Sequence, residues 1–406
     1  MEKSEKIFRL EGSVQHYDWG GKTFLPELLH LENSTGKPYA EFWMGAHLKS
    51  PSEIVFRDGR KQPLHELISA DPQYWLGKTV AAKFGSLPYL LKAQDVKHML
   101  SIQVHPSKQE AEKKFLDENE RGIPLDAGNR NYKDKNHKPE LLSPLSDFYL
   151  LHGFKSPDKL RAILKNTPEL NFLVEYFEGD DYQRIYTHLM RMHQAEVNLR
   201  LEPLLQRIAP SYDAGKISKD AEDFWAARAA GTFGSKKNRD RGIFSIYLFN
   251  VVRMTPGQAL FQDAGLPHAY LEGHTMEIMA NSDNVLRGGL TPKHIDVDEL
   301  LEHIIFRATI PAVIAARPIV NSAEVFKTPA KDFELSKITL DPGGRFQWTS
   351  SGPEILFVYH GSTTVEQEAE SLNANSGQAV FVAPEAKASL SSLVPSVIFR
   401  ASVPGD

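Results

Sequence analysis

The chain has 406 residues, of which 41% are hydrophobic and 24% charged, and its formal net charge is -5 at pH 7. This length predicts two to four domains of a soluble globular protein, at roughly 100 to 200 residues for each domain. So small a net charge creates no global field that would favour nucleic acid or an anionic membrane, and an anionic ligand must be held by local Lys and Arg side chains.

The sequence contains no cysteine. This excludes disulfides, thiolate nucleophiles and cysteine-type zinc sites, so any metal must use nitrogen and oxygen ligands. No apolar run approaches the ~18 residues that a membrane span needs. The charged start Met1–Lys6 leads into no apolar run of signal-peptide length. We therefore expect a cytoplasmic protein without a nucleic-acid or membrane partner.

The first hundred residues, from Ile7 to about Ser101, are mostly short strand-like runs between turns. A short helix that begins at a proline, Pro63–Ile68, separates two of these runs. The β-branched and aromatic residues of the runs favour strands. The predicted strands are 40–45, 52–56 and 89–92.

The next strand, Leu100–Pro106, carries polar residues at alternate positions. Successive side chains of a strand point to opposite faces, so Ser101, Gln103 and His105 share one face, opposite the apolar Ile102 and Val104. The polar face can hold a metal or a ligand. Directly after it, Ser107 is a typical N-cap, which predicts a helix from Ser107 to about Glu118.

A second polar pair follows in His137–Glu140. Pro139 favours an extended residue before it, which would place Lys138 and Glu140 on the same side. Beyond residue 155 the pattern changes, because apolar residues recur at helical spacing from the helix-start signal Ser156–Asp158 onward. This helical segment ends in the polar, glycine-bearing stretch 231–242. A block of helices between two strand-rich parts indicates an inserted domain.

Strand signals return with Phe244–Val252. The pentapeptides Gly257–Phe261 and Gly377–Phe381 differ at one position of five, and each follows a strand-rich run and a turn. The similar placement of the two pentapeptides suggests two copies of one β-barrel unit. Only the first copy leads to a histidine, His268, so the second barrel is expected to bind no metal. Its predicted strands include 335–340, 355–360 and 397–403.

Four polar side chains from these segments form a credible ligand set for a divalent metal. They offer two ring nitrogens, one carboxylate and one amide oxygen, which leaves a position open for a substrate. A triad of two histidines and one carboxylate would also suit an iron-dependent cupin oxygenase, and the ligand types alone leave that alternative open. The four residues are Gln103, His105, Glu140 and His268.

Longer segments resemble type I mannose-6-phosphate isomerases, in order from about residue 13 to 310. Several long segments in order are far more specific than one short pattern. The resemblance is weaker through the helical block and at the C-terminus. The segments are 40–47, 100–106, 130–140, 267–271 and 281–293.

This resemblance implies zinc-dependent cupin barrels with a helical domain, and interconversion of mannose 6-phosphate and fructose 6-phosphate. It assigns one Zn²⁺ per chain to Gln103, His105, Glu140 and His268, the positions that the residue types had already suggested. It also places Arg287 at the active site. The implied pathway is the biosynthesis of GDP-mannose.

Aldose–ketose isomerisation moves a proton between C1 and C2 through an enediol, so it needs a base and cations where negative charge develops. The group that takes the carbon-bound proton stays open among His137, Lys138, Asp283 and Glu277, with a preference for Lys138 or Asp283. Arg287 remains protonated and suits enediolate or phosphate. The expected catalytic residues are Arg287, Lys138, Asp283 and His137, and the expected substrate contacts are Ser101, Lys92, Trp19, Glu277 and Lys293.

The expected fold is mainly β with an α-helical domain, namely two cupin-like jelly-roll β-barrels plus an inserted helical domain. We expect a monomer. The rival function is a non-catalytic cupin that binds a phosphosugar, but Lys138, Asp283 and Arg287 favour catalysis because a pure binder needs no proton shuttle. The predicted domains are 1–154 and 241–318 (catalytic cupin), 155–240 (helical insertion) and 319–406 (metal-free cupin-like domain).

Overall fold

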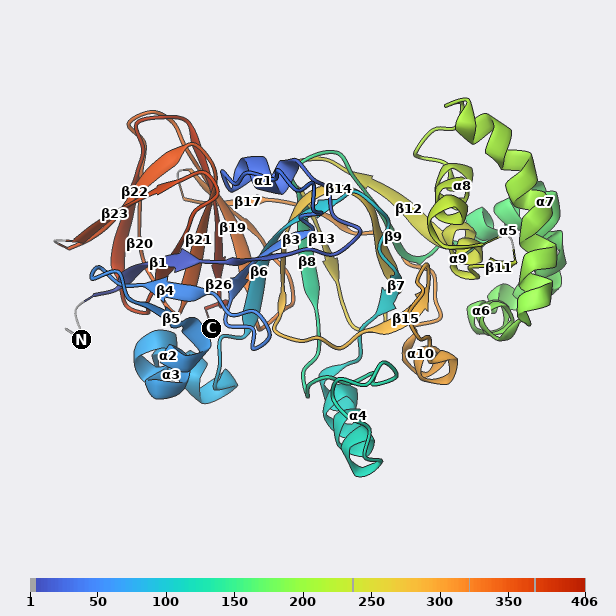
Figure 1. The fold of residues 1–406 in the computed structure, drawn as a ribbon, viewed down its shortest axis with the longest axis horizontal. Coiled ribbons are helices and arrows are strands. Elements are labelled where there is room, and N and C mark those ends of the chain that lie inside the picture. The colour runs from blue at the N-terminus through green and yellow to red at the C-terminus, as the bar shows by residue number, and fades with distance from the viewer. Residues whose placement is uncertain (1–4, 236, 321, 369, 406) are drawn as a thin grey trace.

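The computed structural model describes residues 5–235, 237–320, 322–368 and 370–405, so most of the charged start Met1–Lys6 lies outside the described residues. Three parts follow one another along the long axis (Figure 1): the mainly C-terminal strands, the central strands, and a group of helices. No described helix is long and apolar enough to cross a membrane. The fold is a mixed one of strands and helices.

Two antiparallel sheets in the centre share the long strand β14 (His268–Ala280). The first part of β14 pairs with β7 and β9, and its second part pairs with β6 and β8. Gly273 lies at the junction with φ 128°, where a Cβ would meet the carbonyl oxygen of Asp147 at 2.5 Å. Glycine thus lets one strand serve both sheets.

The order of the first central sheet follows β14 outward to both edges. It is β16 (Val313–Ala315), β13 (Gln258–Gln262), β8 (Glu140–Pro144), β14, β6 (Tyr89–Val96), β3 (Glu41–Gly45) and β2 (Ser13–Gln15). The second is β12 (Phe249–Met254), β9 (Phe148–Phe154), β14, β7 (Ile102–Val104) and β15 (Leu286–Gly289). Leu142, Leu150 and Leu260 pack together from the two sheets.

The C-terminal strands form two further antiparallel sheets. The N-terminal strand joins the larger one, because Leu10 pairs with Ala379. The larger sheet is β17 (Arg317–Val320), β18 (Ala323–Phe326), β19 (Glu334–Leu340), β26 (Ser396–Ser402), β21 (Glu354–His360), β24 (Ala379–Val382), β1 (Ile7–Glu11), β4 (Glu53–Val55) and β5 (Lys61–Pro63). The smaller is β20 (Arg345–Thr349), β25 (Lys387–Ser391), β22 (Ser362–Gln367) and β23 (Glu370–Asn375).

A large apolar cluster joins the central and C-terminal sheets. Phe42 of β3 and Leu91 of β6 pack in it with Phe357 of β21 and Phe381 of β24. The rings of Phe42 and Phe357 have centroids 6.1 Å apart. Burial of such aromatic side chains on both sides fixes the first central sheet against the C-terminal one.

The helices between β9 and β12 pack on the outer face of the second central sheet, through Leu151 and Leu271 among others. The apolar stripes predicted as helical lie in the first four of these elements. They are α5 (Pro157–Asn166), the 3₁₀ segment η1 (Pro168–Asp180), α6 (Tyr182–Arg191), α7 (Gln194–Asp213), α8 (Glu222–Thr232) and α9 (Gly242–Leu248), with a small hairpin of β10 (Gly234–Ser235) and β11 (Asn238–Arg239).

The remaining helices lie between strands. The helix predicted at Ser107 is confirmed: Ser107 accepts from the backbone of Glu110, whose side chain accepts from the backbone of Ser107 in return. This capping box satisfies two of the free donors at a helix start. These helices are α1 (Phe24–Leu28), α2 (Leu64–Ala70), α3 (Pro72–Phe84), α4 (Lys108–Glu120) and α10 (Val297–His303).

The strand predicted over Phe244–Val252 is wrong in its first half. Residues up to Leu248 form helix α9, and β12 begins only at Phe249. All the side chains of α9 are buried. An apolar run that is buried on every side has no polar positions to reveal its period, so the sequence does not distinguish helix from strand there.

The two related pentapeptides adopt the same turn. Gly257 and Gly377 both have positive φ, 92° and 81°. The side-chain oxygen of Gln258 accepts from the backbone N–H of Thr255 at 2.9 Å, and that of Gln378 accepts from Asn375 at 3.0 Å. Strands β13 and β24 follow. The repeat is therefore structural at this turn.

The bend of β14 gives a test of how the two central sheets are held. Gly273→Ala combines a strained φ with a backbone clash, so we expect a stability loss above about 3 kcal/mol. Gly257→Ala is the control, because its Cβ would meet nothing within 4 Å, and it should lose only about 1–2 kcal/mol. Urea denaturation followed by tryptophan fluorescence measures both. Equal losses would contradict the role given to Gly273.

Candidate metal centre

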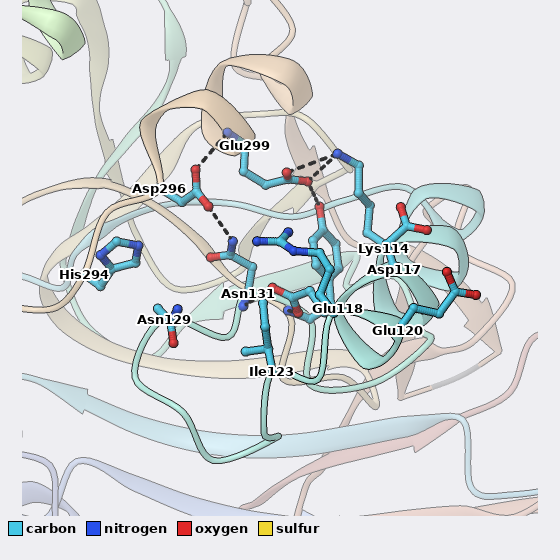
Figure 2. Close-up of a pocket in the computed structure, with 12 residues that line it drawn as sticks. Lys114, Asp117, Glu118, Glu120, Ile123, Asn129, Asn131, His294, Asp296 and Glu299 are labelled. Atoms are coloured by element: carbon cyan, nitrogen blue, oxygen red, sulfur yellow. Dashed lines mark hydrogen bonds and ion pairs between the residues drawn. The ribbon is translucent and has the colours of Figure 1, made fainter.

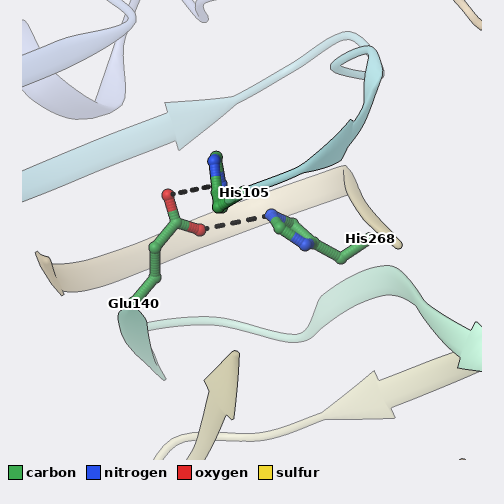
Figure 3. Close-up of side chains that lie close together, drawn as sticks. All are labelled: His105, Glu140 and His268. Atoms are coloured by element: carbon green, nitrogen blue, oxygen red, sulfur yellow. Dashed lines mark ion pairs between the residues drawn. The ribbon is translucent and has the colours of Figure 1, made fainter. Parts of the chain in front are cut away.

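Side chains from three separate segments converge between the two central sheets: His105, Glu140 and His268 (Figure 3). His105 follows β7, Glu140 begins β8 and His268 begins β14. All three are buried, and their ligand atoms lie within 4.8 Å of one another. Strand pairing fixes this approach, because the backbone of His268 lies opposite Gln103 and that of Met279 opposite Glu140.

Each imidazole turns a lone pair toward the Glu140 carboxylate. Nδ1 of His105 lies 2.8 Å from the carbonyl oxygen of Asn284, and Nδ1 of His268 lies 2.9 Å from that of Leu266. A carbonyl can only accept, so both Nδ1 atoms carry the hydrogen and the neutral rings leave Nε2 as an acceptor. The two Nε2 atoms lie 3.3 Å from Oε1 and Oε2 of Glu140, respectively. Three acceptors thus face one another, and a cation between them stabilises that arrangement.

The protonation states also suit a metal. Burial, assisted by the nearby Lys138 ammonium, lowers the pKa of His105 to about 4. Burial by itself would raise the pKa of Glu140, but the nearby Lys138 ammonium holds it well below its usual range. Nε2 of His105 has no hydrogen-bond partner among the described residues. Neutral imidazoles and an ionised carboxylate are the forms that bind a divalent metal, so these residues fit one.

Gln103 lies on the same face as this group. Its backbone is paired with His268 on one side and Arg287 on the other, and its side chain lines the cavity beside Glu140. The neighbours Ile102 and Val104 point the opposite way, into the apolar cluster under the helices. This is the alternation that the sequence predicted. Its role as a fourth ligand stays a prediction.

Three charged residues predicted from the sequence also line this cavity: Lys138, Lys92 and Glu277. Nζ of Lys138 lies 3.0 Å from Oε1 of Glu140, and Nζ of Lys92 lies 2.9 Å from Oε2 of Glu277. Burial alone would lower the pKa of Lys92, but the carboxylates of Glu277 and Glu41 raise it by more than burial lowers it. Lys92 therefore stays an ammonium. Burial raises the pKa of Glu277, and the Lys92 charge offsets only part of that rise.

Sequence reasoning missed three other polar residues that line the cavity: Glu41, Gln94 and Tyr270. Nε2 of Gln94 donates to Glu41 at 2.7 Å and to Glu277 at 3.0 Å, and the Tyr270 hydroxyl donates to Glu277 at 2.6 Å. The sequence signal that could have found two of them is the alternation of side chains along a strand, in which every second residue shares a face. Gln94 stands two residues after Lys92 on β6, and Tyr270 stands two after His268 on β14.

Asp283 is held by two basic residues outside the cavity lining. Its carboxylate lies 2.6 Å from Nζ of Lys49 and 3.4 Å from Nε2 of His47. Burial would raise the pKa of Asp283, but the hydrogen bonds and charges of His47 and Lys49 lower it below its usual range. Asp283 is therefore a weak base in this position.

Arg287 and Lys293 supply positive charge near the cavity. Arg287 lies opposite Gln103 in the β15–β7 pair, half-buried, and its side chain makes no hydrogen bond or ion pair with any described residue. Burial lowers the pKa of Arg287. Burial and the Arg287 charge both lower the pKa of Lys293.

The remaining predicted residues are not among those that line the cavity. Nε2 of His137 lies 3.0 Å from both carboxylate oxygens of Asp332. Trp19 stacks on Tyr17, with ring centroids 5.8 Å apart, and packs against the apolar cluster between the central sheets. Ser101 is half-buried just before β7.

A second group that could hold a metal lies on α10: Glu299, Glu302 and His303. Figure 2 shows Glu299 and Lys114 beside a neighbouring cavity. Nζ of Lys114 lies 2.9 Å from Glu299 and 2.7 Å from Glu302, and the Tyr132 hydroxyl donates to Glu299 at 2.6 Å. Glu302 is exposed and Glu299 only half-buried, whereas His105, Glu140 and His268 are all buried, so the group around Glu140 is the better metal site.

The chain is similar to proteins of known function. Residues 7–157 match the family model of phosphomannose isomerase type I, catalytic domain. The chain is 37% identical to mannose-6-phosphate isomerase of Escherichia coli (strain K12) over 380 residues, which covers 92% of this chain and 94% of the relative.

Two crystal structures are similar over 99% of this chain and 100% of theirs, each with a TM-score of 0.87 and 32% identity. One is mannose 6-phosphate isomerase from Salmonella typhimurium bound to its substrate, fructose 6-phosphate, and to zinc. The other is mannose 6-phosphate isomerase bound with zinc and yttrium.

Removal of one imidazole tests the metal centre. We expect His105→Ala to lose the bound metal, because the loss of one imidazole leaves the ion under-coordinated. His152→Ala is the matched control: this buried imidazole lies opposite His268 in the sheet and forms no ion pair with Glu140. Plasma mass spectrometry after dialysis measures metal per chain. Metal retained by His105→Ala, or lost equally from both variants, would refute the assignment.

Proposed function

The chain belongs to the type I phosphomannose isomerase family, and we propose that its metal centre interconverts mannose 6-phosphate and fructose 6-phosphate. The observation that carries the proposal is the convergence of two neutral imidazoles and one carboxylate beside Lys138 in a buried polar cavity. The isomerase relatives favour this reaction over a phosphosugar-binding regulator and over an iron-dependent oxygenase.

Zinc, one ion per chain, is the metal of this site. His105, Glu140 and His268 would hold it, and Gln103 would add a neutral amide oxygen, which are donors that zinc accepts. When bound, zinc supplies positive charge that stabilises the sugar oxygens as negative charge develops on them. One carboxylate among neutral ligands leaves the centre cationic.

The carbon-bound proton needs a side chain that can accept it and return it. We assign this role to Glu277, because burial raises its pKa and because it lines the cavity with Glu140. Lys138, 3.0 Å from Glu140, is placed to move a proton at the sugar oxygens. Asp283 is the weaker candidate since its pKa is lowered, and His137 contacts Asp332 instead.

Arg287 is assigned to the anionic parts of the substrate. The enediolate and the phosphate both carry negative charge, and an arginine stays protonated at any working pH. Its position opposite Gln103 places its side chain on the face that carries the proposed metal ligands. Its guanidinium forms no hydrogen bond or ion pair with any described residue. Lys293 adds a second cation beside it. Lys92 holds Glu277 in place rather than binding the sugar directly.

For the architecture, we propose two cupin-like barrels, one from the central sheets and one from the C-terminal sheets, with the helices of 155–240 as an insertion. The shared turn at Gly257 and Gly377 supports a common ancestor for the two units. The strand β1 would then belong with the second barrel, through its pairing to β24. The monomeric state, the cytoplasmic location and the role in GDP-mannose biosynthesis stay predictions.

The proposed function is tested by measuring fructose 6-phosphate formed from mannose 6-phosphate in a coupled assay. The zinc-loaded wild type should turn over, and Arg287→Ala should lose about 10²- to 10³-fold in kcat while keeping its zinc. Arg253→Ala, which removes only an exposed ion pair to Asp147, is the control and should be unaffected.

Two outcomes of this assay would count against the proposal. No turnover by the folded, zinc-loaded wild type would exclude the isomerase activity itself. A zinc-replete Arg287→Ala enzyme with a near-normal rate would exclude only the role given to Arg287.

A further inference from the structure

A buried glutamine, Gln262, lies against the metal-binding carboxylate. It is fully buried on β13, directly opposite Glu140 on β8. Its Nε2 lies 3.2 Å from Oε2 of Glu140 and 2.9 Å from the hydroxyl oxygen of Tyr270. Neither the sequence pattern nor the ligand set singled it out.

The direction of these hydrogen bonds is fixed by the donors available. The Tyr270 hydroxyl has one hydrogen, and it goes to Oε1 of Glu277 at 2.6 Å. The Tyr270 oxygen therefore accepts from Gln262, and the second hydrogen of the same amide goes to Glu140. Because Lys92 donates to the other oxygen of Glu277, one buried chain runs from Glu140 through Gln262, Tyr270 and Glu277 to Lys92.

Glu140 is thus held from the protein side at both oxygens. Lys138 lies 3.0 Å from Oε1, and Gln262 donates to Oε2. The same oxygens face the imidazoles, Oε1 toward His105 and Oε2 toward His268. These two donors fix the carboxylate in the rotamer that presents both oxygens between the imidazoles, before any metal binds.

We propose that Gln262 is a positioning residue for the metal centre, which orients Glu140 for zinc and ties it through Tyr270 to the Glu277–Lys92 pair. It acts through Glu140 and is not among the residues that line the cavity. Its own side-chain oxygen has no hydrogen-bond partner among the described residues. A side chain needed only to fill this space would be better apolar, since a buried unpaired oxygen is unfavourable. The inference rests on the proposed function only in taking this group as a zinc site.

The test is zinc affinity, measured by competition with a chromogenic chelator. Gln262→Met keeps the volume and removes both donors, so affinity should fall about 10- to 100-fold.

The matched control is Gln367→Met. Gln367 is also buried in a strand, β22, and its side-chain oxygen is likewise without a partner among the described residues, but it lies in the C-terminal sheets. The loss of a buried amide there should leave zinc affinity unchanged. The melting temperature of each metal-free variant separates an effect on folding from an effect on the metal.

A third variant covers the case in which Gln262→Met does not fold. Tyr270→Phe removes only the hydroxyl that orients Gln262, and it should weaken zinc binding by less than Gln262→Met. In the double variant, zinc affinity should be no weaker than in Gln262→Met alone, because Tyr270 reaches Glu140 only through Gln262.

Unchanged zinc affinity in Gln262→Met, or in Tyr270→Phe if the former does not fold, would overturn the proposal. So would an equal loss in Gln367→Met. This readout is independent of catalysis. A wild type that binds zinc without isomerase activity would contradict the proposed function, and the competition assay would still decide the role of Gln262.

Discussion

The site depends on one electrostatic constraint, the approach of three acceptors in a water-poor interior. The Nε2 atoms of His105 and His268 each lie 3.3 Å from an oxygen of Glu140, and neither ring can donate there because Nδ1 already donates to a carbonyl. Such a group is stable only with positive charge beside it. Lys138 provides part of that charge from the protein, and a divalent metal provides the rest.

The register of the strand pairs brings the residues of the site together. Gln103 pairs with His268, Glu140 with Gln262, and Lys92 with Glu277, so these six polar residues of the site lie directly opposite one another in the ladders. A slip of one residue in any of these pairs would turn the side chain to the opposite face. The bend at Gly273 allows β14 to take part in both sheets, and the helices cover the apolar outer face of the second sheet. The site is thus carried by the paired strands of the two central sheets.

Much of this site could be predicted from the sequence because its residues stand in segments with a clear period. Gln103 alternates with Ile102 and Val104, and Lys138 and Glu140 flank a proline, so their faces follow from local geometry. Gln262 and Glu41 could not be found in this way, since their partners come from other strands. His137 shows that a neighbour in sequence need not join the site: it adjoins Lys138 in sequence, but its side chain contacts Asp332. The helix α9 was missed because it is buried on every side.

The most direct test is a zinc titration of the metal-free protein, with isomerase activity measured after each addition. If one zinc held by His105, Glu140 and His268 is the catalytic metal, activity should start near zero, rise linearly and reach its plateau at one zinc per chain. Full activity in the chelated protein, or a plateau only at two zinc ions per chain, would contradict a single catalytic metal centre between the central sheets.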